Sequence, residues 1–269
     1  MSHLYIRYWG VRGSIPVPGP STVRYGGNTS CLELRTESGR TILDGGTGVA
    51  GLGPKIAQPE ELHLLLSHLH WDHIQGFPFF VPVYRKDFRI HLYSGHKASH
   101  SLEEVLRGQM QEPNFPLNMD GLPASLTFNE IHEGGEFDIP GAHVQTVPLH
   151  HPNGATGFKF LTGGKTFVHL TDHEHTADFE DSIVSFCAGV DVLSMDTMYT
   201  PEDYPSHVGW GHSSWLHACI IARQAGVKKL VLFHHNPVHN DEIMDEIGKK
   251  ARKEFPETIV SYEGLELEL

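Results

Sequence analysis

Four side chains of the type that binds metal ions lie within six positions of the sequence: His68, His70, Asp72 and His73. A continuous apolar run at residues 64–66 precedes them and predicts a buried strand that ends where the polar cluster begins. On extended backbone, His68 and His70 leave from the same side of the chain, so their imidazoles can hold one cation together. Asp72 and His73 follow in the turn and can bind a second cation nearby. The sequence therefore predicts half of a two-metal site.

Imidazole and carboxylate ligands without a thiolate favour zinc, with manganese or iron as alternatives. A hydroxide held between two such metals is a strong nucleophile. Any one histidine carries little information, because the chain contains 21 of them. A solvated turn, however, does not explain four ligand-type side chains directly after an apolar run.

The segment from His68 to His73 resembles the HxHxDH signature of the metallo-β-lactamase superfamily of hydrolases. The resemblance implies the α/β fold of that superfamily, a four-layer αβ/βα sandwich with two divalent metal ions bound between its sheets. Asp72, as a ligand close to the attacking hydroxide, could also accept its proton.

Two later strand ends supply further ligands under this resemblance. The strand predicted at residues 143–149 runs into His150 and His151, where the superfamily places the third histidine of the first metal. A proline follows directly, and on that pattern His151 is the ligand and His150 the alternative. Asp172 follows the strand predicted at residues 166–171 and resembles the aspartate that bridges both metals.

The segment 211–235 is similar to the phosphodiesterase branch of the superfamily, which includes tRNase Z. It consists of Gly-His-Ser-Ser at 211–214, a predicted helix at 215–225 and a predicted strand at 229–233. In that branch the histidine at the start of the helix contacts the phosphate or protonates the leaving oxygen. The resemblance implies that His212 is this acid and His234 the second-metal ligand, with His235 as the alternative. The positive helix end predicts a lowered pKa for His212.

Two other aspartates could support the ligands. Asp44 opens an Asp-Gly-Gly-Thr-Gly turn that resembles the turn in which the superfamily orients a ligand histidine by a hydrogen bond. An ordinary hairpin exit is the alternative. Asp196 ends the next buried strand and could act in the same way. His173, Glu174 and His175 are expected to be solvated loop residues.

The remaining pattern predicts one domain over residues 1–269, with an insertion at about 77–124. Further strands are predicted at 4–9, 31–35, 40–43, 88–93, 125–131, 157–161, 190–195, 258–262 and 265–269, and further helices at 102–110, 178–186 and 241–253. Within the insertion, Phe77, Phe79 and Phe80 could stack on a nucleobase, with core packing as the alternative.

Composition narrows the classes of partner. The formal net charge of −13 weighs against a large nucleic-acid partner, and a small molecule is favoured. Three scattered cysteines without a CxxC motif, Cys31, Cys187 and Cys219, indicate a reducing, cytoplasmic location. No apolar window long enough to span a membrane is present. Arg12 and Arg24 stand out as cations, and hydration at the surface is the ordinary role of such side chains.

The leading functional prediction is a metal-dependent phosphodiesterase for a small phosphodiester, with 3',5'-cyclic nucleotides first among the substrates. Trp9-Gly10-Val11-Arg12-Gly13-Ser14 and Tyr25-Gly26-Gly27-Asn28-Thr29-Ser30 support it, since both resemble bacterial proteins grouped with cyclic nucleotide phosphodiesterases. The alternatives are tRNA 3' processing, hydrolysis of a cyclic phosphate in phosphonate metabolism, and a nucleotide-binding sensor without turnover. The long glycine-rich basic arm usual in tRNase Z is not visible in the sequence. Related enzymes often dimerise, so a homodimer is a further expectation.

Overall fold

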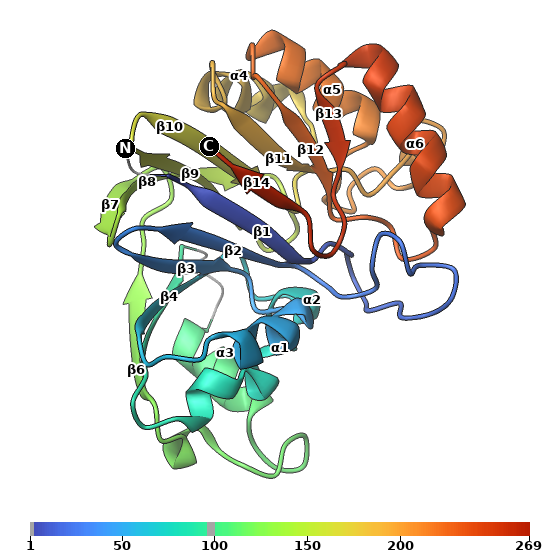
Figure 1. Cartoon of the computed structure of the whole chain (residues 1–269). Helices are drawn as coiled ribbons and strands as arrows, with labels where there is room; N and C mark the ends of the chain where they lie inside the picture. Colours follow the sequence, from blue (N-terminus) through green and yellow to red (C-terminus); the bar gives the residue numbers. More distant parts are fainter. Residues whose placement is uncertain (1–2, 96–99) are drawn as a thin grey trace.

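Two seven-stranded β-sheets pack face to face, and helices cover the outer face of each sheet (Figure 1). The computed structural model describes residues 3–95 and 100–269; residues 1–2 and 96–99 lie outside the described part, the latter within the predicted insertion. The predicted α/β four-layer sandwich is confirmed.

The first sheet comes from the N-terminal half of the chain and has the strand order β14-β1-β2-β3-β4-β5-β6. Its strands are β1 (Tyr5–Gly10), β2 (Cys31–Thr36), β3 (Gly39–Leu43), β4 (Glu61–Leu66), β5 (Arg89–Ser94), β6 (Ser125–Glu130) and the C-terminal β14 (Glu266–Glu268). Strands β3 to β6 run parallel to one another. The carboxyl ends of β3 and β4 therefore meet at the same edge of the sheet.

The second sheet has the order β13-β12-β11-β10-β9-β8-β7. Its strands are β7 (Glu136–Ile139), β8 (Ala142–Leu149), β9 (Ala155–Thr162), β10 (Lys165–Leu170), β11 (Val192–Asp196), β12 (Leu230–Phe233) and β13 (Thr258–Val260). Strands β10 to β13 are parallel, while β7 to β10 form an antiparallel meander. Polar residues that follow β10, β11 and β12 are thus delivered to one edge.

Three of the six α-helices in the described part of the chain begin at a side chain that accepts a backbone hydrogen bond. The helices are α1 (Gly48–Leu52), α2 (Trp71–Ile74), α3 (Leu102–Gln109), α4 (Ala177–Phe186), α5 (Trp215–Gln224) and α6 (Asp241–Glu254). Short 3-10 turns are η1 (Gly53–Lys55), η2 (Phe77–Phe79), η3 (Val81–Tyr84), η4 (Met119–Gly121) and η5 (Tyr204–Ser206). Ser101 and Glu104 form a capping box at α3, and Ser214 and Asn240 cap α5 and α6.

Three apolar layers hold the sandwich together. The middle layer lies between the sheets and includes Ile6 and Leu65 of the first sheet with Phe160 and Val231 of the second. A second layer joins the first sheet to α1 and α3, and a third joins the second sheet to α4, α5 and α6. Burial of apolar surface in all three layers supplies the main driving force for this arrangement.

Three short elements differ from the predictions: β7, α1 and α2 were not expected as separate elements. Helix α1 has glycine at its first position and again three residues later, a composition that disfavours helix in isolation. Its close approach to β1 explains the glycine, because a Cβ on Gly48 would lie 2.7 Å from backbone atoms of Trp9 and Gly10. Tertiary packing therefore decides the conformation of this segment.

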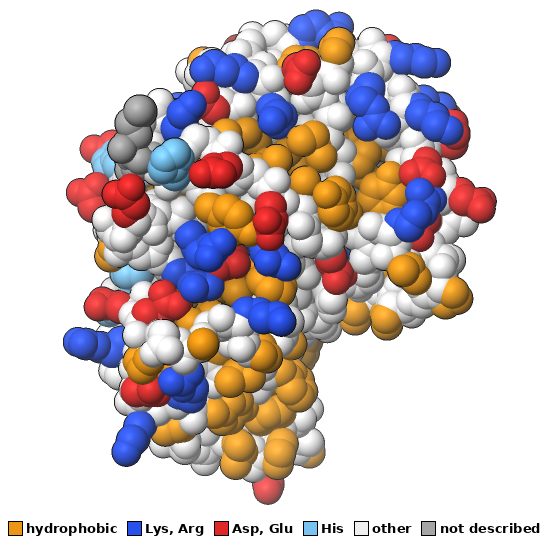
Figure 2. Space-filling model, viewed as in Figure 1, with side chains coloured by type: hydrophobic (Ala, Val, Ile, Leu, Met, Phe, Trp, Pro, Cys, Tyr) orange, Lys and Arg blue, Asp and Glu red, His pale blue; other side chains and the backbone are white. Residues whose placement is uncertain are grey.

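The charged side chains of the face shown in Figure 2 are mixed in sign, with Lys and Arg interspersed among Asp and Glu. The whole chain carries a formal net charge of −13. Among residues 3–95 and 100–269, no helix is both long and apolar enough to cross a membrane.

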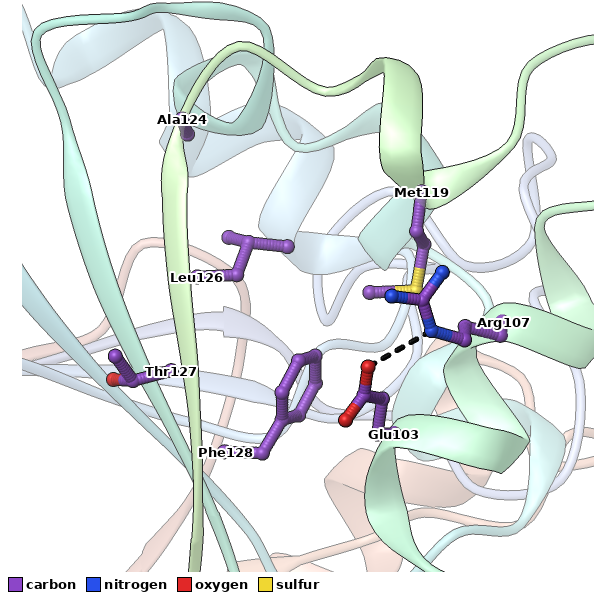
Figure 3. A pocket seen from close by; sticks show the side chains of 7 residues that line it. All are labelled: Glu103, Arg107, Met119, Ala124, Leu126, Thr127 and Phe128. Carbon is purple, nitrogen blue, oxygen red and sulfur yellow. Dashed lines mark hydrogen bonds and ion pairs between the residues drawn. The ribbon is translucent and has the colours of Figure 1, made fainter.

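A cavity of about 540 Å³ lies between α3, η4 and β6, in and beside the segment predicted as an insertion (Figure 3). Met119, Leu126 and Phe128 contribute apolar walls. Glu103 and Arg107 at the cavity pair with each other at 2.9 Å. None of the predicted metal ligands lines this cavity, so it is separate from the site described next.

Candidate metal centre

The seven predicted ligands converge at the carboxyl ends of four strands. They are His68, His70, Asp72, His73, His151, Asp172 and His234. The first four follow β4 of the first sheet, whereas the other three follow β8, β10 and β12 of the second. The structure therefore brings the two halves of the sequence signature together between the sheets.

The first group of potential ligand atoms is formed by three histidines and one carboxylate oxygen. His70 Nδ1 lies 3.0 Å from His68 Nε2 and 3.0 Å from His151 Nε2. Asp172 Oδ2 lies 3.5 Å from the Nε2 atoms of both His68 and His151. Four atoms from two sheets thus surround one position.

The second group contains two histidines and two carboxylates. Asp72 Oδ2 lies 3.3 Å from His73 Nε2 and 3.2 Å from His234 Nε2. Asp172 Oδ1 lies 3.2 Å and 3.1 Å from the same two nitrogens. Asp172 therefore turns one oxygen toward each group, the arrangement that a bridging ligand requires.

These separations fit divalent cations. Tetrahedral binding at about 2.0–2.1 Å from each nitrogen places neighbouring ligand atoms about 3.3 Å apart. The atom pairs given above are separated by 3.0–3.5 Å, and all ligand atoms of each group lie within 4.8 Å of one another. Imidazole and carboxylate donors are also the ligand types that zinc and related metals prefer.

Hydrogen bonds fix the outward nitrogens of several ligand rings. Asp44 Oδ2 lies 2.8 Å from His73 Nδ1, and its Oδ1 accepts the backbone N–H of Ser67 at 2.8 Å. The Ser67 hydroxyl contacts both Asp44 and His68 Nδ1. His151 Nδ1 donates to the carbonyl of Gly211 at 2.9 Å. Such contacts leave Nε2 of each ring for a cation, and Asp44 lies in the supporting position that the resemblance assigned to it.

Burial and charge oppose each other in this cluster. Burial lowers the pKa of His68 well below its usual value, and nearby His73 adds to this effect. Burial also acts to lower the pKa of His73, but the carboxylates of Asp172, Asp72 and Asp44 raise it well above its usual value. Three buried carboxylates around one imidazole thus form a site that favours positive charge.

Three residues at this centre adopt left-handed backbone conformations that are uncommon for side chains other than glycine. Asp44, Asp172 and His234 have φ values of 60°, 50° and 58° and directly or almost directly follow β3, β10 and β12. Each such residue carries strain of about 1–3 kcal/mol. The bends turn these side chains from the strand ends into the site.

His212 lies beside the second ligand group and pairs with Asp196, whose Oδ2 is 2.7 Å from His212 Nδ1. The predicted lowering of the His212 pKa is wrong in this structure. Burial does lower it, but the Asp196 carboxylate and then Asp172 and Asp72 raise the pKa of His212 to about 9. The direction of this pKa shift favours the protonated ring at neutral pH.

The two alternative ligands lie outside the groups. His235 is fully buried, and its Nε2 donates to the Ser261 carbonyl at 2.8 Å. The backbone N–H of His150 donates to Nδ1 of His173 at 3.1 Å, and neither alternative shares a cluster with the other ligand atoms. The geometry favours His151 and His234 as ligands.

The expectation that His173, Glu174 and His175 are solvated loop residues is wrong for His173 and Glu174, which are buried, whereas His175 is half-buried. Glu174 is buried, and its carboxylate accepts the backbone N–H groups of Gly209 and Gly211 and the hydroxyl of Tyr204. Although burial acts to raise the pKa of Glu174, these hydrogen bonds lower it. Glu174 therefore holds the loop that leads into His212.

Arg12 is likewise not a hydrated surface residue. It is fully buried and donates from Nη1 to the carbonyls of Asn236 and His239 and from Nε to that of Gly26. These bonds tie the N-terminal loop to the segment after β12. The sequence does not reveal its partners, because Asn236 and His239 lie 224 and 227 residues later in the chain.

The three phenylalanines considered for stacking divide into two sorts. Phe77 and Phe80 are buried in the layer beneath the first sheet, so core packing is their role. Phe79 is 62% exposed, with its ring edge-on to Phe115 at 5.7 Å.

The fold and the site together define the class of this protein as a hydrolase with the metallo-β-lactamase fold. Residues 40–235 match the family described as the beta-lactamase superfamily domain, and the chain belongs to this family.

Similar proteins agree with this class. A protein named ribonuclease Z from Azobacteroides pseudotrichonymphae is 26% identical over 238 residues, covering 76% of this chain and 78% of its own. The metallo-beta-lactamase fold protein YhfI from Bacillus subtilis superposes with a TM-score of 0.78 at 20% identity over 100% of both chains. A diphosphatase of the PhnP family has a TM-score of 0.74 at 17% identity, covering 99% of this chain and 98% of its own. At these identities the two structures establish the fold alone.

Proposed function

We propose that this chain is a dinuclear-metal phosphodiesterase that hydrolyses a small phosphodiester, with 3',5'-cyclic nucleotides as its leading substrates. His68, His70 and His151 would hold one cation, and Asp72, His73 and His234 the other, with Asp172 shared. The observation that carries this proposal is the placement of the two Asp172 oxygens, each 3.1–3.5 Å from the nitrogens of a different group.

Two divalent cations, when bound, neutralise charge on the phosphoryl oxygens and make water a stronger nucleophile at neutral pH. Water adds to phosphorus in line with the ribose oxygen that leaves, and Asp72 accepts the proton of the water. The bond between phosphorus and the leaving oxygen breaks, and His212 donates its proton to that oxygen. Asp196 holds the His212 ring by its Nδ1 and stabilises the protonated form.

The acidic charge of the chain supports the proposal of a small substrate. The chain is acidic, and on the face in Figure 2 the basic side chains are interspersed with acidic ones rather than gathered in a stripe. A structured RNA binds chiefly through neutralisation of its phosphates, and a chain with a net charge of −13 offers little for that purpose. Processing of tRNA 3' ends is the second candidate, because a 26% identical relative is named ribonuclease Z.

Zinc is the metal that we propose first, since imidazole and carboxylate ligands at tetrahedral spacing suit it. Cytoplasmic location is also a proposal, supported by three cysteines that are buried and unpaired. A homodimer stays an expectation from the resemblance.

The test is hydrolysis of 3',5'-cAMP, 2',3'-cAMP, bis(p-nitrophenyl) phosphate and a 3'-extended tRNA by zinc- and manganese-loaded protein, with a chelated control. We expect turnover of at least one small diester, abolished by chelation and restored by metal. Cleavage of the tRNA alone would replace the proposal by its second candidate. Two bound metals without any turnover would contradict both.

A further inference from the structure

A pocket of about 330 Å³ opens beside His212. Its walls come from three separate stretches: residues 198–212, residues 236–238 and Ser14. A volume of roughly 300 Å³ is the lower end of the range for small-molecule sites. The backbone N–H of Ser14 also donates to Asp72 Oδ2 at 2.7 Å, so the pocket adjoins the second ligand group.

Aromatic rings line one wall in a continuous series from His212 outward. The Tyr199 ring lies 6.1 Å from that of His212 and stacks on His207 at 4.4 Å and 22°. The Trp210 ring meets His207 edge-on at 5.0 Å. Trp210 is 61% exposed, and Val238, which also lines the pocket, is 77% exposed. Large apolar side chains left in water at the mouth of a polar site indicate a surface that a flat ligand covers.

Two polar side chains at the pocket can form hydrogen bonds with the edge of a bound ring. Asp203 lines it with a carboxylate, of which Oδ2 accepts the Thr200 hydroxyl. Asn236 lines it with an amide whose oxygen accepts the Val238 N–H. The carboxylate accepts and the amide NH₂ donates, a combination that matches the mixed donors and acceptors of a nucleobase edge.

The pocket walls are fixed by buried charged residues. Glu174 accepts the N–H groups of Gly209 and Gly211 on either side of Trp210. Arg12 donates to the carbonyl of Asn236 at 3.1 Å and holds the opposite wall. A preformed pocket binds a planar group with little loss of conformational freedom.

We propose that this pocket binds the nucleobase of the substrate, with Trp210 as its stacking face. The inference rests on the proposed phosphodiesterase function and adds the place where the nucleobase of the substrate binds. Because His212 borders both the pocket and the ligand cluster, the base lies on the side of the leaving oxygen. The substrate class is then a nucleotide diester rather than a diester without a base.

The experiment compares 3',5'-cAMP with 1-O-methylribose 3',5'-cyclic phosphate, which has the same cyclic diester and no base. Stacking of one base on an aromatic ring predicts that Trp210→Ala lowers kcat/KM for cAMP roughly 10-fold. Turnover of the baseless diester should not change, and Trp210→Phe should retain most of the activity on cAMP. Phe79→Ala is the matched variant, because Phe79 is an exposed aromatic residue that was also considered for stacking, and its exposed fraction of 62% is close to the 61% of Trp210.

A binding measurement separates failure of this inference from failure of the proposed function. Calorimetry measures the binding of adenosine to zinc-loaded protein without any hydrolysis. We expect Trp210→Ala to raise the Kd for adenosine at least 5-fold. Equal Kd values for wild type and Trp210→Ala, or a larger effect of Phe79→Ala, would overturn the base pocket. Adenosine binding that depends on Trp210, in a protein that cleaves no diester, would support the pocket and reject the phosphodiesterase.

Discussion

At the scale of single residues, Asp172 has the most demanding position in the centre. Its Oδ1 faces His73 and His234, while its Oδ2 faces His68 and His151. We expect Asp172→Ala to lose at least one of two bound metals, because Asp172 is the carboxylate that belongs to both groups. Metal content after gel filtration, measured by mass spectrometry, checks this. Two metals per chain in the variant would remove Asp172 as the bridge.

His212 is the residue to which we assign protonation of the leaving oxygen. His212→Ala should lower kcat on substrates with poor leaving groups by about 10²-fold or more, and less on p-nitrophenyl esters, whose leaving group needs no proton. Metal content serves as the control, since His212 is not among the proposed ligands. An equal loss on both kinds of substrate would show that the residue acts otherwise.

Asp196 sets the protonation of His212 through the 2.7 Å contact. The carboxylate raises the pKa of His212, so the protonated acid is lost only as the pH rises through that raised value. In Asp196→Asn the pKa should return toward its ordinary value, and the alkaline limb of the kcat profile should move to lower pH. Rate profiles on cAMP for both proteins test this prediction. A limb that does not move would exclude His212 as the group that titrates.

At the scale of elements, the loop before α5 couples the two sides of the site. Gly211 has a φ of 84°, and a Cβ there would collide with the His151 ring and with Pro152. Gly211→Ala should therefore displace His151 and weaken the first metal site, seen as a lower zinc content at limiting zinc. Gly209→Ala is a matched control, because Gly209 has a φ of 87° and its Cβ would meet nothing within 4 Å. If both variants lose metal equally, backbone strain rather than the His151 contact is responsible.

The strand ends of this site could be predicted from sequence, whereas its loops could not. Apolar runs such as residues 64–66 and 230–233 identify buried strands, and ligand-type residues directly after them are a local signal. Glu174 has no such signal, because its partners Gly209 and Gly211 lie 35 and 37 residues later in the chain. The role of Trp210 depends on the same distant contact.

At the scale of the whole molecule, the proposed cations link the two sheets. Four ligands come from the first sheet and three from the second. A metal at about 1,000 times its Kd stabilises the folded state by about 4 kcal/mol. For a chain of this size that corresponds to a Tm increase of roughly 10 °C.

We therefore expect chelation to lower the Tm of the protein by roughly this amount and added zinc to restore it, measured by calorimetry. Asp172→Ala should respond much less to zinc, since it lacks the shared ligand. A Tm that does not depend on metal would mean that the sheets are held by their apolar layers alone.

The layered architecture was predictable because the resemblance spans the ligand-bearing strands of both sheets. The charge of His212 was not, because the prediction counted the helix end and left out the carboxylates that face the ring. Asp196 at the end of β11 and Asp172 after β10, together with Asp72, raise the pKa of His212 and outweigh the effect of burial. Such a balance depends on residues brought together only by the complete fold.

The left-handed conformations of Asp44, Asp172 and His234 have an evolutionary consequence. Glycine adopts this conformation without strain. Glycine at any of the three positions would therefore remove backbone strain, but it would also remove the side chain that takes part in the chemistry. In a duplicated protein whose catalytic activity is no longer under selection, mutations to glycine at these positions should therefore be favoured. Glycine at two of them in a descendant would mark a duplicated gene product that has lost its enzymatic role.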